Sequence, residues 1–210
     1  MNLLDQLLKD YLKSNDTGRI FTNPVKPIYL VIGWLHLLLP LFILKLGYDA
    51  FADSYGFSDL RSVFGDYTFI IVFVLIILFA AACVTAYLAI KLWTDRANRV
   101  EVLIKSQNEF CVLPIVTTYL RNQGEGQALV ILIMGIAFSI AVGLGLVFLA
   151  VAESDYFSQI FKHAMGVLFG GIIVSIVVSY LTLVLHRFLS EAIGLLVSIA
   201  SNVSRMAHRD

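Results

Sequence analysis

Four long stretches without a charged residue limit what this chain can fold into more than any other feature. They cover residues 27–44, 67–90, 126–152 and 164–186 and hold no Asp, Glu, Lys or Arg. A helix needs about 20 apolar residues to cross the roughly 30 Å hydrocarbon core of a bilayer. The chain is also 59% hydrophobic and only 14% charged, unlike a typical soluble domain. We therefore expect an all-α integral membrane protein with four transmembrane helices.

The orientation in the membrane is predicted from the positions of Lys and Arg. Of the 15 such residues, the N-terminal segment carries four, the connection 91–125 carries five and the C-terminal tail carries three. Loops rich in Lys and Arg stay on the cytoplasmic side. We expect a multi-pass protein of the cell membrane with both termini cytoplasmic. The formal net charge of zero predicts no nucleic-acid partner.

The charge pattern divides the chain into three parts. Residues 1–16 are expected to form an amphipathic helix in the membrane interface. Residues 25–186 form the four-span domain, which includes a cytoplasmic helical hairpin at 94–125, and residues 187–210 form a cytoplasmic C-terminal helix. The apolar face of the first helix comprises Leu3, Leu4, Leu7, Leu8, Tyr11 and Leu12.

Prolines and glycines predict where the helices bend or end. Pro40 is expected to kink the first span. The second helix should continue past Trp93 into the cytoplasm, and Pro114 can open the second helix of the hairpin. Gly124 and Gly126 are expected to mark a joint before the third span. This hairpin would be the largest extramembrane piece and a natural docking surface.

One face of the fourth helix stays apolar beyond the point where the helix leaves the membrane. At 100° per residue its members share a broad stripe, in which Gly166 and Gly170 have GxxxG spacing. Past His186 the stripe continues with the spacing of a coiled-coil seam, which must be covered in water. The face could pack on helix two of the same chain or on helix four of a second subunit, and we expect the second, a homo-oligomer. The stripe also includes Val174 and Val177. The expected interface comprises Gly166, Gly170, Leu181, Leu185, Phe188, Ala192, Leu195, Ile199, Val203 and Met206.

A second stripe on the same helix is polar or small. Its members all lie within roughly 40° of Ser175 on the helical count. Two interpretations stay open: a pore or cavity lining, or helix packing in which Ser and Thr bond to preceding carbonyls. The stripe comprises Gly171, Ser175, Ser179, Thr182 and His186.

No residue pattern predicts catalysis, a metal site or a cofactor. No Asp, Glu, Lys or Arg lies deep in a span, and the missing carboxylate disfavours ion-coupled transport. His36 and His186 could suggest haem, but His36 lies about 13 Å inside the membrane edge at 1.5 Å per residue, whereas His186 lies at that edge. Cys83 and Cys111 form no CxxC pair.

The two ends of the chain resemble a family of small bacterial membrane proteins of unknown function. The similarity lies in "FTNPVKPIYLVIGWL" and "LHRFLSEAIGLLVSIASNVSRMA", and the exit pattern corresponds to Arg187, Glu191, Ile199 and Asn202. Thr22-Asn23-Pro24 stands in place of an adjacent Thr-Pro, and the middle spans have no counterpart. The resemblance implies no activity.

These features predict a non-enzymatic, self-associating membrane protein. A pore or channel formed by the oligomer is one version of this prediction. The alternative is an accessory or regulatory subunit that binds a cytoplasmic or membrane partner protein through the hairpin and the tail. A small membrane redox protein is disfavoured.

Overall fold

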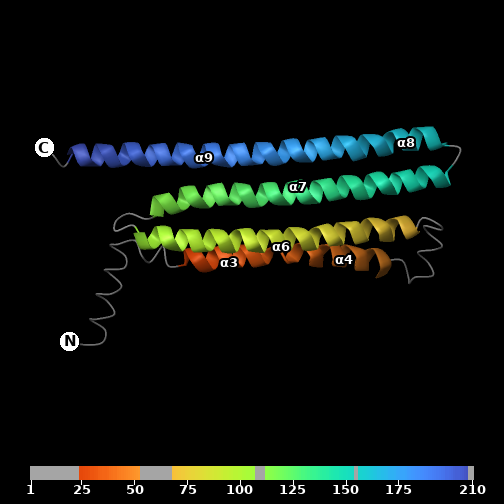
Figure 1. The fold of residues 1–210 in the computed structure, drawn as a ribbon, viewed down its shortest axis with the longest axis horizontal. Helices are drawn as coiled ribbons and strands as arrows, with labels where there is room; N and C mark the ends of the chain where they lie inside the picture. Colours follow the sequence, from red (N-terminus) through yellow and green to blue (C-terminus); the bar gives the residue numbers. More distant parts are fainter. Residues whose placement is uncertain (1–23, 53–67, 107–111, 154–155, 208–210) are drawn as a thin grey trace, which may run out of the picture. The chain divides into compact units, whose positions relative to one another are not determined.

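A computed structural model of the chain describes residues 24–52, 68–106, 112–153 and 156–207. The predicted amphipathic helix at 1–16, with Leu3, Leu4, Leu7, Leu8, Tyr11 and Leu12, lies outside these residues. The described segments are almost entirely helical, which confirms the predicted all-α class (Figure 1). In order they are α3 (Val25–Leu35), α4 (Leu38–Ala52), α6 (Thr68–Ser106), α7 (Val112–Ala152), α8 (Phe157–Met165), the π-helical turn η3 (Gly166–Gly170) and α9 (Gly171–Ala207).

Within the described residues, four helical segments are long and apolar enough to cross a membrane, as the sequence predicts. They are Val25–Asp49, Thr68–Val102, Ile115–Ala152 and Phe157–Leu196. Both α6, with 39 residues, and α7, with 41, are longer than a bilayer requires. At 1.5 Å per residue they reach about 60 Å, twice the thickness of the hydrocarbon core. The fourth span is also longer than a bilayer requires, because α9 continues for 37 residues to Ala207. The second and fourth helices are thus extended, as predicted.

The first span is interrupted between α3 and α4, close to the kink expected from Pro40. Proline has no N–H to donate to the carbonyl four residues earlier, which is that of His36. This carbonyl accepts instead from the N–H of Leu39 at 3.1 Å, and the N–H of Leu37 donates to Trp34 at 3.0 Å. The chain makes a tight turn there and then resumes as α4.

The joint expected at Gly124 and Gly126 does not exist, because α7 is continuous from Val112 to Ala152. Both glycines are instead points of close approach. A Cβ atom at Gly124 would overlap the side chain of His186, and one at Gly126 would lie 3.1 Å from Nε1 of Trp93. The sequence prediction was wrong because glycine can serve either a turn or a tight helix contact.

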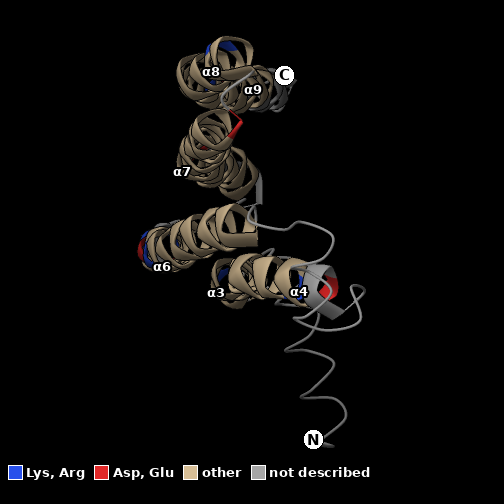
Figure 2. Ribbon diagram, turned by 90° about the vertical axis from the view of Figure 1, so that its right-hand side faces the viewer, with Lys and Arg blue, Asp and Glu red and all other residues tan. Residues whose placement is uncertain are grey.

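The described residues form two compact units. The polar unit comprises 24–33, 90–106, 112–126 and 182–207, and the apolar unit comprises 34–52, 68–89, 127–153 and 156–181. Most charged residues of the described chain belong to the polar unit. Figure 2 marks the charged positions on the ribbon. Within the apolar unit the Phe148 ring packs against Phe69 and Phe73, with centroid distances of 6.0 and 5.6 Å.

Candidate functional site

The small and polar stripe of α9 packs on α7 in the apolar unit. A Cβ at Gly171 would overlap Ser139, and a Cβ at Gly135 would overlap Ser175, so glycine on each helix faces serine on the other. Each serine hydroxyl donates to its own helix, Ser139 to the Gly135 carbonyl at 2.8 Å and Ser175 to the Gly171 carbonyl at 2.7 Å. The two helices share one Gly-xxx-Ser pattern and approach each other closely.

Ser179 gives this packing a direct hydrogen bond between the helices. Its hydroxyl donates to the carbonyl of Ala128 at 2.9 Å, and only 5% of the residue is exposed. Ser175 is 8% exposed. Because residues later in α9 face residues earlier in α7, the two helices run antiparallel in the apolar unit, side by side in Figure 1.

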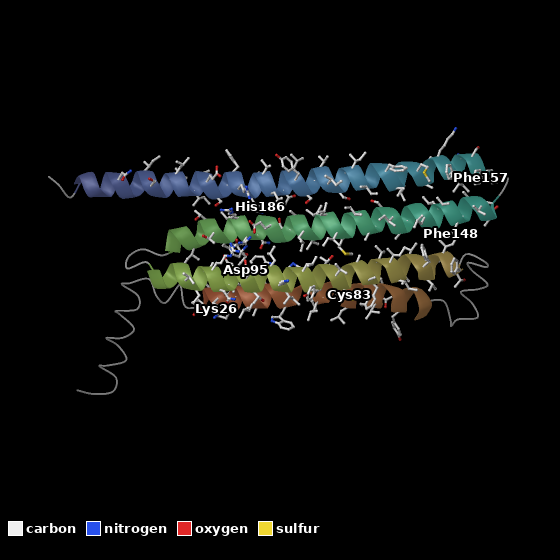
Figure 3. The ribbon with its side chains drawn as sticks, viewed as in Figure 1. Lys26, Cys83, Asp95, Phe148, Phe157 and His186 are labelled. Atoms are coloured by element: carbon white, nitrogen blue, oxygen red, sulfur yellow. The ribbon has the colours of Figure 1, made fainter. Side chains whose placement is uncertain are left out.

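Within the polar unit, α7 and α9 also contact each other. The His186 side chain fills the space left by Gly124, and its Nδ1 lies 2.9 Å from the carbonyl oxygen of Thr182. Figure 3 labels His186 on α9. Further along, the Ser190 hydroxyl donates to the carbonyl of Thr117 at 2.9 Å. In the apolar unit Gly171, Ser175 and Ser179 therefore pack on α7, and in the polar unit His186 does so. The role of Gly171, Ser175, Ser179, Thr182 and His186 as a pore or cavity lining stays a prediction.

The apolar stripe of α9 points away from this packing surface. Leu181 and Leu185 are exposed. In η3, directly before α9, a Cβ at Gly166 or Gly170 would meet no atom within 4 Å. Beyond His186, four large side chains are between 59% and 66% exposed: Phe188, Leu195, Leu196 and Ile199. Ala192 is half-buried. Val203 and Met206 lie in α9, but their side chains are outside the described part of the structure.

A buried polar and aromatic cluster, not predicted from the sequence, joins three helices of the polar unit. Tyr29 of α3 and Trp93 of α6 are each 1% exposed, and their ring centroids are 5.3 Å apart. The Tyr119 ring of α7 packs edge-on against Tyr29 at 5.9 Å. Asn122 donates to the Tyr29 hydroxyl through Nδ2 at 3.3 Å. One hydrogen bond and three rings therefore fix α3 against α6 and α7.

Ion pairs also connect the same three helices of the polar unit. Arg96 of α6 contacts Glu125 of α7 at 2.6 Å, and both side chains are largely buried. Asp95, labelled in Figure 3, binds Arg99 at 2.9 Å. Lys26 of α3 lies 2.7 Å from Glu101 of α6, so the first turn of α3 runs beside the charged part of α6. The charges at these positions are visible in the sequence, but their pairing across helices is not.

Three buried polar atoms in the described residues have no hydrogen-bond partner. They are Nε1 of Trp93, Nε of Arg96 and Oε1 of Gln123. The Trp93 indole packs against the rings of Tyr29 and Tyr119. Gly33 also approaches it closely, because a Cβ at Gly33 would lie 3.0 Å from the Trp93 Cβ. These van der Waals contacts hold the indole although its Nε1 has no hydrogen-bond partner.

The remaining candidate ligand residues, His36 and the two cysteines, lie far apart along the chain. His36 lies in the turn between α3 and α4, and Cys83 is an exposed free thiol of α6; Cys111 is outside the described residues. Across the described ranges, no three His, Cys, Asp or Glu residues group closely enough to hold a metal ion.

Comparisons with family models, with curated proteins and with solved structures find no match for this chain.

Proposed function

We propose that this polytopic membrane protein is non-enzymatic and self-associates through the outer face of α9. The observation that carries the proposal is the exposure of Phe188, Leu195, Leu196 and Ile199 past the charge-free part of the helix. Lipid covers apolar side chains within the bilayer, whereas these four follow Arg187 and are expected to meet water. Burying one such side chain contributes roughly 1.5 to 3 kcal/mol, enough to favour association when several are covered together.

The glycines at the start of the same face support close contact within the membrane. Gly166 and Gly170 are exposed, and the space above both is open. A helix from a second copy could approach them closely, and van der Waals packing would then stabilise the pair. The polar stripe of α9 already packs on α7, so the proposal rests on the apolar face and includes no pore lined by that stripe.

Self-association is tested by combining Gly170→Leu with Leu195→Asp. The leucine fills the open space, and the aspartate places a charge in the apolar face, so the variant should be monomeric in mild detergent by light scattering. Circular dichroism should show unchanged helicity. Val102→Asp is the matched control, because Val102 is equally exposed but lies on α6; it should leave the oligomer intact.

A monomeric wild type at micromolar concentration in several mild detergents would overturn self-association. The exposed face of α9 would then favour the second candidate, an accessory subunit. Val102 of α6 and Val116 of α7 are also exposed on the hairpin and add apolar surface for a partner protein.

A further inference from the structure

Three exposed aromatic residues lie at one end of the apolar unit: Trp34, Tyr87 and Tyr180. Each carries an N–H or O–H group on a largely apolar ring, and the three residues are between 59% and 65% exposed. The unit begins at Trp34 in α3, and it ends at Ala89 in α6 and at Leu181 in α9. The three aromatic side chains therefore come from three helices, close to the same end of the unit.

The packing of α9 on α7 places Tyr180 along the apolar unit. A Cβ at Gly135 would overlap Ser175, so these two residues lie opposite each other in antiparallel helices. Tyr180 is five residues after Ser175, and Val130 is five residues before Gly135. Tyr180 is therefore level with Val130 of α7.

An independent count on α6 places Tyr87 at the same level. A Cβ at Gly145 of α7 would lie 3.1 and 3.2 Å from the side chains at the two ends of the α6 turn 70–74. The middle of this turn is therefore level with Gly145. Because α6 and α7 run antiparallel, 15 residues onward in α6 and 15 residues back in α7 lead to Tyr87 and Val130. Tyr87 and Tyr180 are thus level with one residue of α7.

The packing of the first span on α6 places Trp34. A Cβ at Gly47 would lie 3.7 Å from Cδ1 of Leu75. Counting 13 residues back from Gly47 and 13 onward from Leu75 puts Trp34 opposite residue 88, next to Tyr87. Trp34, Tyr87 and Tyr180 therefore form one ring around the apolar unit, which we call the inner ring.

An outer ring of exposed aromatic residues lies at the other end of the unit and comprises Phe69, Phe148 and Phe157. The rings of Phe69 and Phe148 pack with their centroids 6.0 Å apart. Phe148 and Phe157 are labelled at the same end of α7 and α8 in Figure 3. Phe69 precedes Tyr87 by 18 residues of continuous helix, so about 27 Å separate the two rings at 1.5 Å per residue.

The spacing and composition of the two rings fit a lipid bilayer, whose hydrocarbon core is about 30 Å thick. Trp and Tyr concentrate where this core meets the headgroups, because the apolar ring lies among acyl chains while the N–H or O–H reaches the polar layer. Between the rings, residues 70–86 of α6 carry no charge. The exposed side chains there include the aliphatic Ile76 of α6 and Ile173 of α9.

We propose that the inner ring binds the phospholipid headgroup layer, with the Trp34 indole N–H and the Tyr87 and Tyr180 hydroxyls in that layer. In the predicted topology this is the cytoplasmic leaflet, and the outer ring marks the edge of the opposite leaflet. The charged residues predict a different edge, since the first charge-free stretch begins at Pro27, seven residues before Trp34. With the edge at the inner ring, residues 27–33 lie outside the hydrocarbon. The proposal does not depend on self-association through α9.

Fluorescence quenching by brominated lipids tests the depth of the inner ring. Trp93→Phe leaves Trp34 as the only tryptophan, and adding Trp34→Phe with Tyr87→Trp or Tyr180→Trp moves this single reporter to the other two positions. Each full-length variant is reconstituted in phosphatidylcholine that carries bromine either near the headgroup end or near the methyl end of its acyl chains. All three reporters should be quenched about twofold more strongly by the shallow bromine, because the ring lies at the edge of a hydrocarbon layer about 15 Å deep in each leaflet.

Ile76→Trp in the tryptophan-free background is the matched control, because Ile76 is nearly as exposed as Tyr87 and lies on the same helix. It is 11 residues, or about 17 Å, farther into the membrane, so the deep bromine should quench it more strongly. Stronger quenching of Tyr87→Trp and Tyr180→Trp by the deep bromine would overturn the proposal. The same quenching pattern for Ile76→Trp and Tyr87→Trp would also overturn it.

If Trp93→Phe does not fold, a nitroxide at Cys83 measures the same edge with both tryptophans in place. Cys83 is an exposed free thiol of α6, four residues or about 6 Å deeper than Tyr87. In Cys111→Ser, collisions of the nitroxide with oxygen and with a water-soluble nickel complex should place the label about 6 Å inside the hydrocarbon edge. A depth of about 12 Å, which an edge at Lys91 requires, would contradict the inner ring.

Discussion

At the scale of single residues, Asn122 and Tyr29 form a buried side-chain hydrogen bond in the polar unit. Asn122 of α7 is 3% exposed and donates to the hydroxyl of Tyr29 in α3. The two residues are 93 positions apart in the sequence. A buried polar group that loses its partner costs more than the net contribution of the hydrogen bond. The two residues must therefore be considered as a pair.

Asn122→Leu should lower the free energy of unfolding by about 1 to 3 kcal/mol, because it leaves the buried Tyr29 hydroxyl without its donor. The double variant Asn122→Leu, Tyr29→Phe should recover part of this loss, since both polar groups are gone. Thermal unfolding in detergent followed by circular dichroism measures the difference. A double variant less stable than Asn122→Leu alone would contradict this account of the pair.

At the scale of elements, the antiparallel packing of α7 and α9 depends on the small residues that face each other. Gly135→Leu should destabilise the chain, because its Cβ would already overlap Ser175. Overpacking of this kind costs about 1 to 3 kcal/mol or more.

The matched control is Gly194→Leu on α9, where an added Cβ would meet no atom within 4 Å. The melting temperature measured by circular dichroism should fall clearly for Gly135→Leu and stay near that of the wild type for Gly194→Leu. Equal melting temperatures for the two variants would show that this contact is not tight in solution.

The sequence predicts where the helices lie along the chain better than it predicts which helices pack against each other. Long apolar stretches without charge fold as helices in a bilayer, so the four spans were predictable from the positions of the charged residues. Helical periodicity also placed Ser175 and Ser179 on one face of α9. It could not say that α7 covers this face, because periodicity defines which residues share a face and not what lies opposite. Gly126 was misread for the same reason: its neighbour, Trp93, lies on another helix.

The buried cluster of the polar unit was missed because its signals are ordinary when read one at a time. Tyr29, Trp93 and Tyr119 are aromatic residues near the ends of apolar stretches, where a membrane-interface role is also common. Their convergence depends on the register of α3 against α6, which the pair of Lys26 and Glu101 indicates only once the helices are placed together.

At the scale of the whole molecule, the prediction is that both termini and the connection between α6 and α7 are cytoplasmic. Single cysteines at Asp59 and Gln107, both outside the described residues, report on opposite sides in a background without Cys83 and Cys111. An impermeant thiol reagent applied to intact cells should label position 59 and spare position 107, because Lys and Arg concentrate on the cytoplasmic side. Permeabilised cells, in which both positions should react, provide the control. Labelling of 107 but not 59 would reverse the orientation.

The serines of α7 and α9 have a further consequence for the order in which the protein assembles. Ser139 and Ser175 donate to carbonyls of their own helices, so neither hydroxyl needs a partner from the other helix. Each helix can therefore enter lipid with these groups already satisfied, which avoids the cost of an unpaired group in hydrocarbon. During synthesis α7 emerges before α9, and its glycines have no α9 partner until α9 has been made. Insertion of α7 and its packing against α9 are thus separable events.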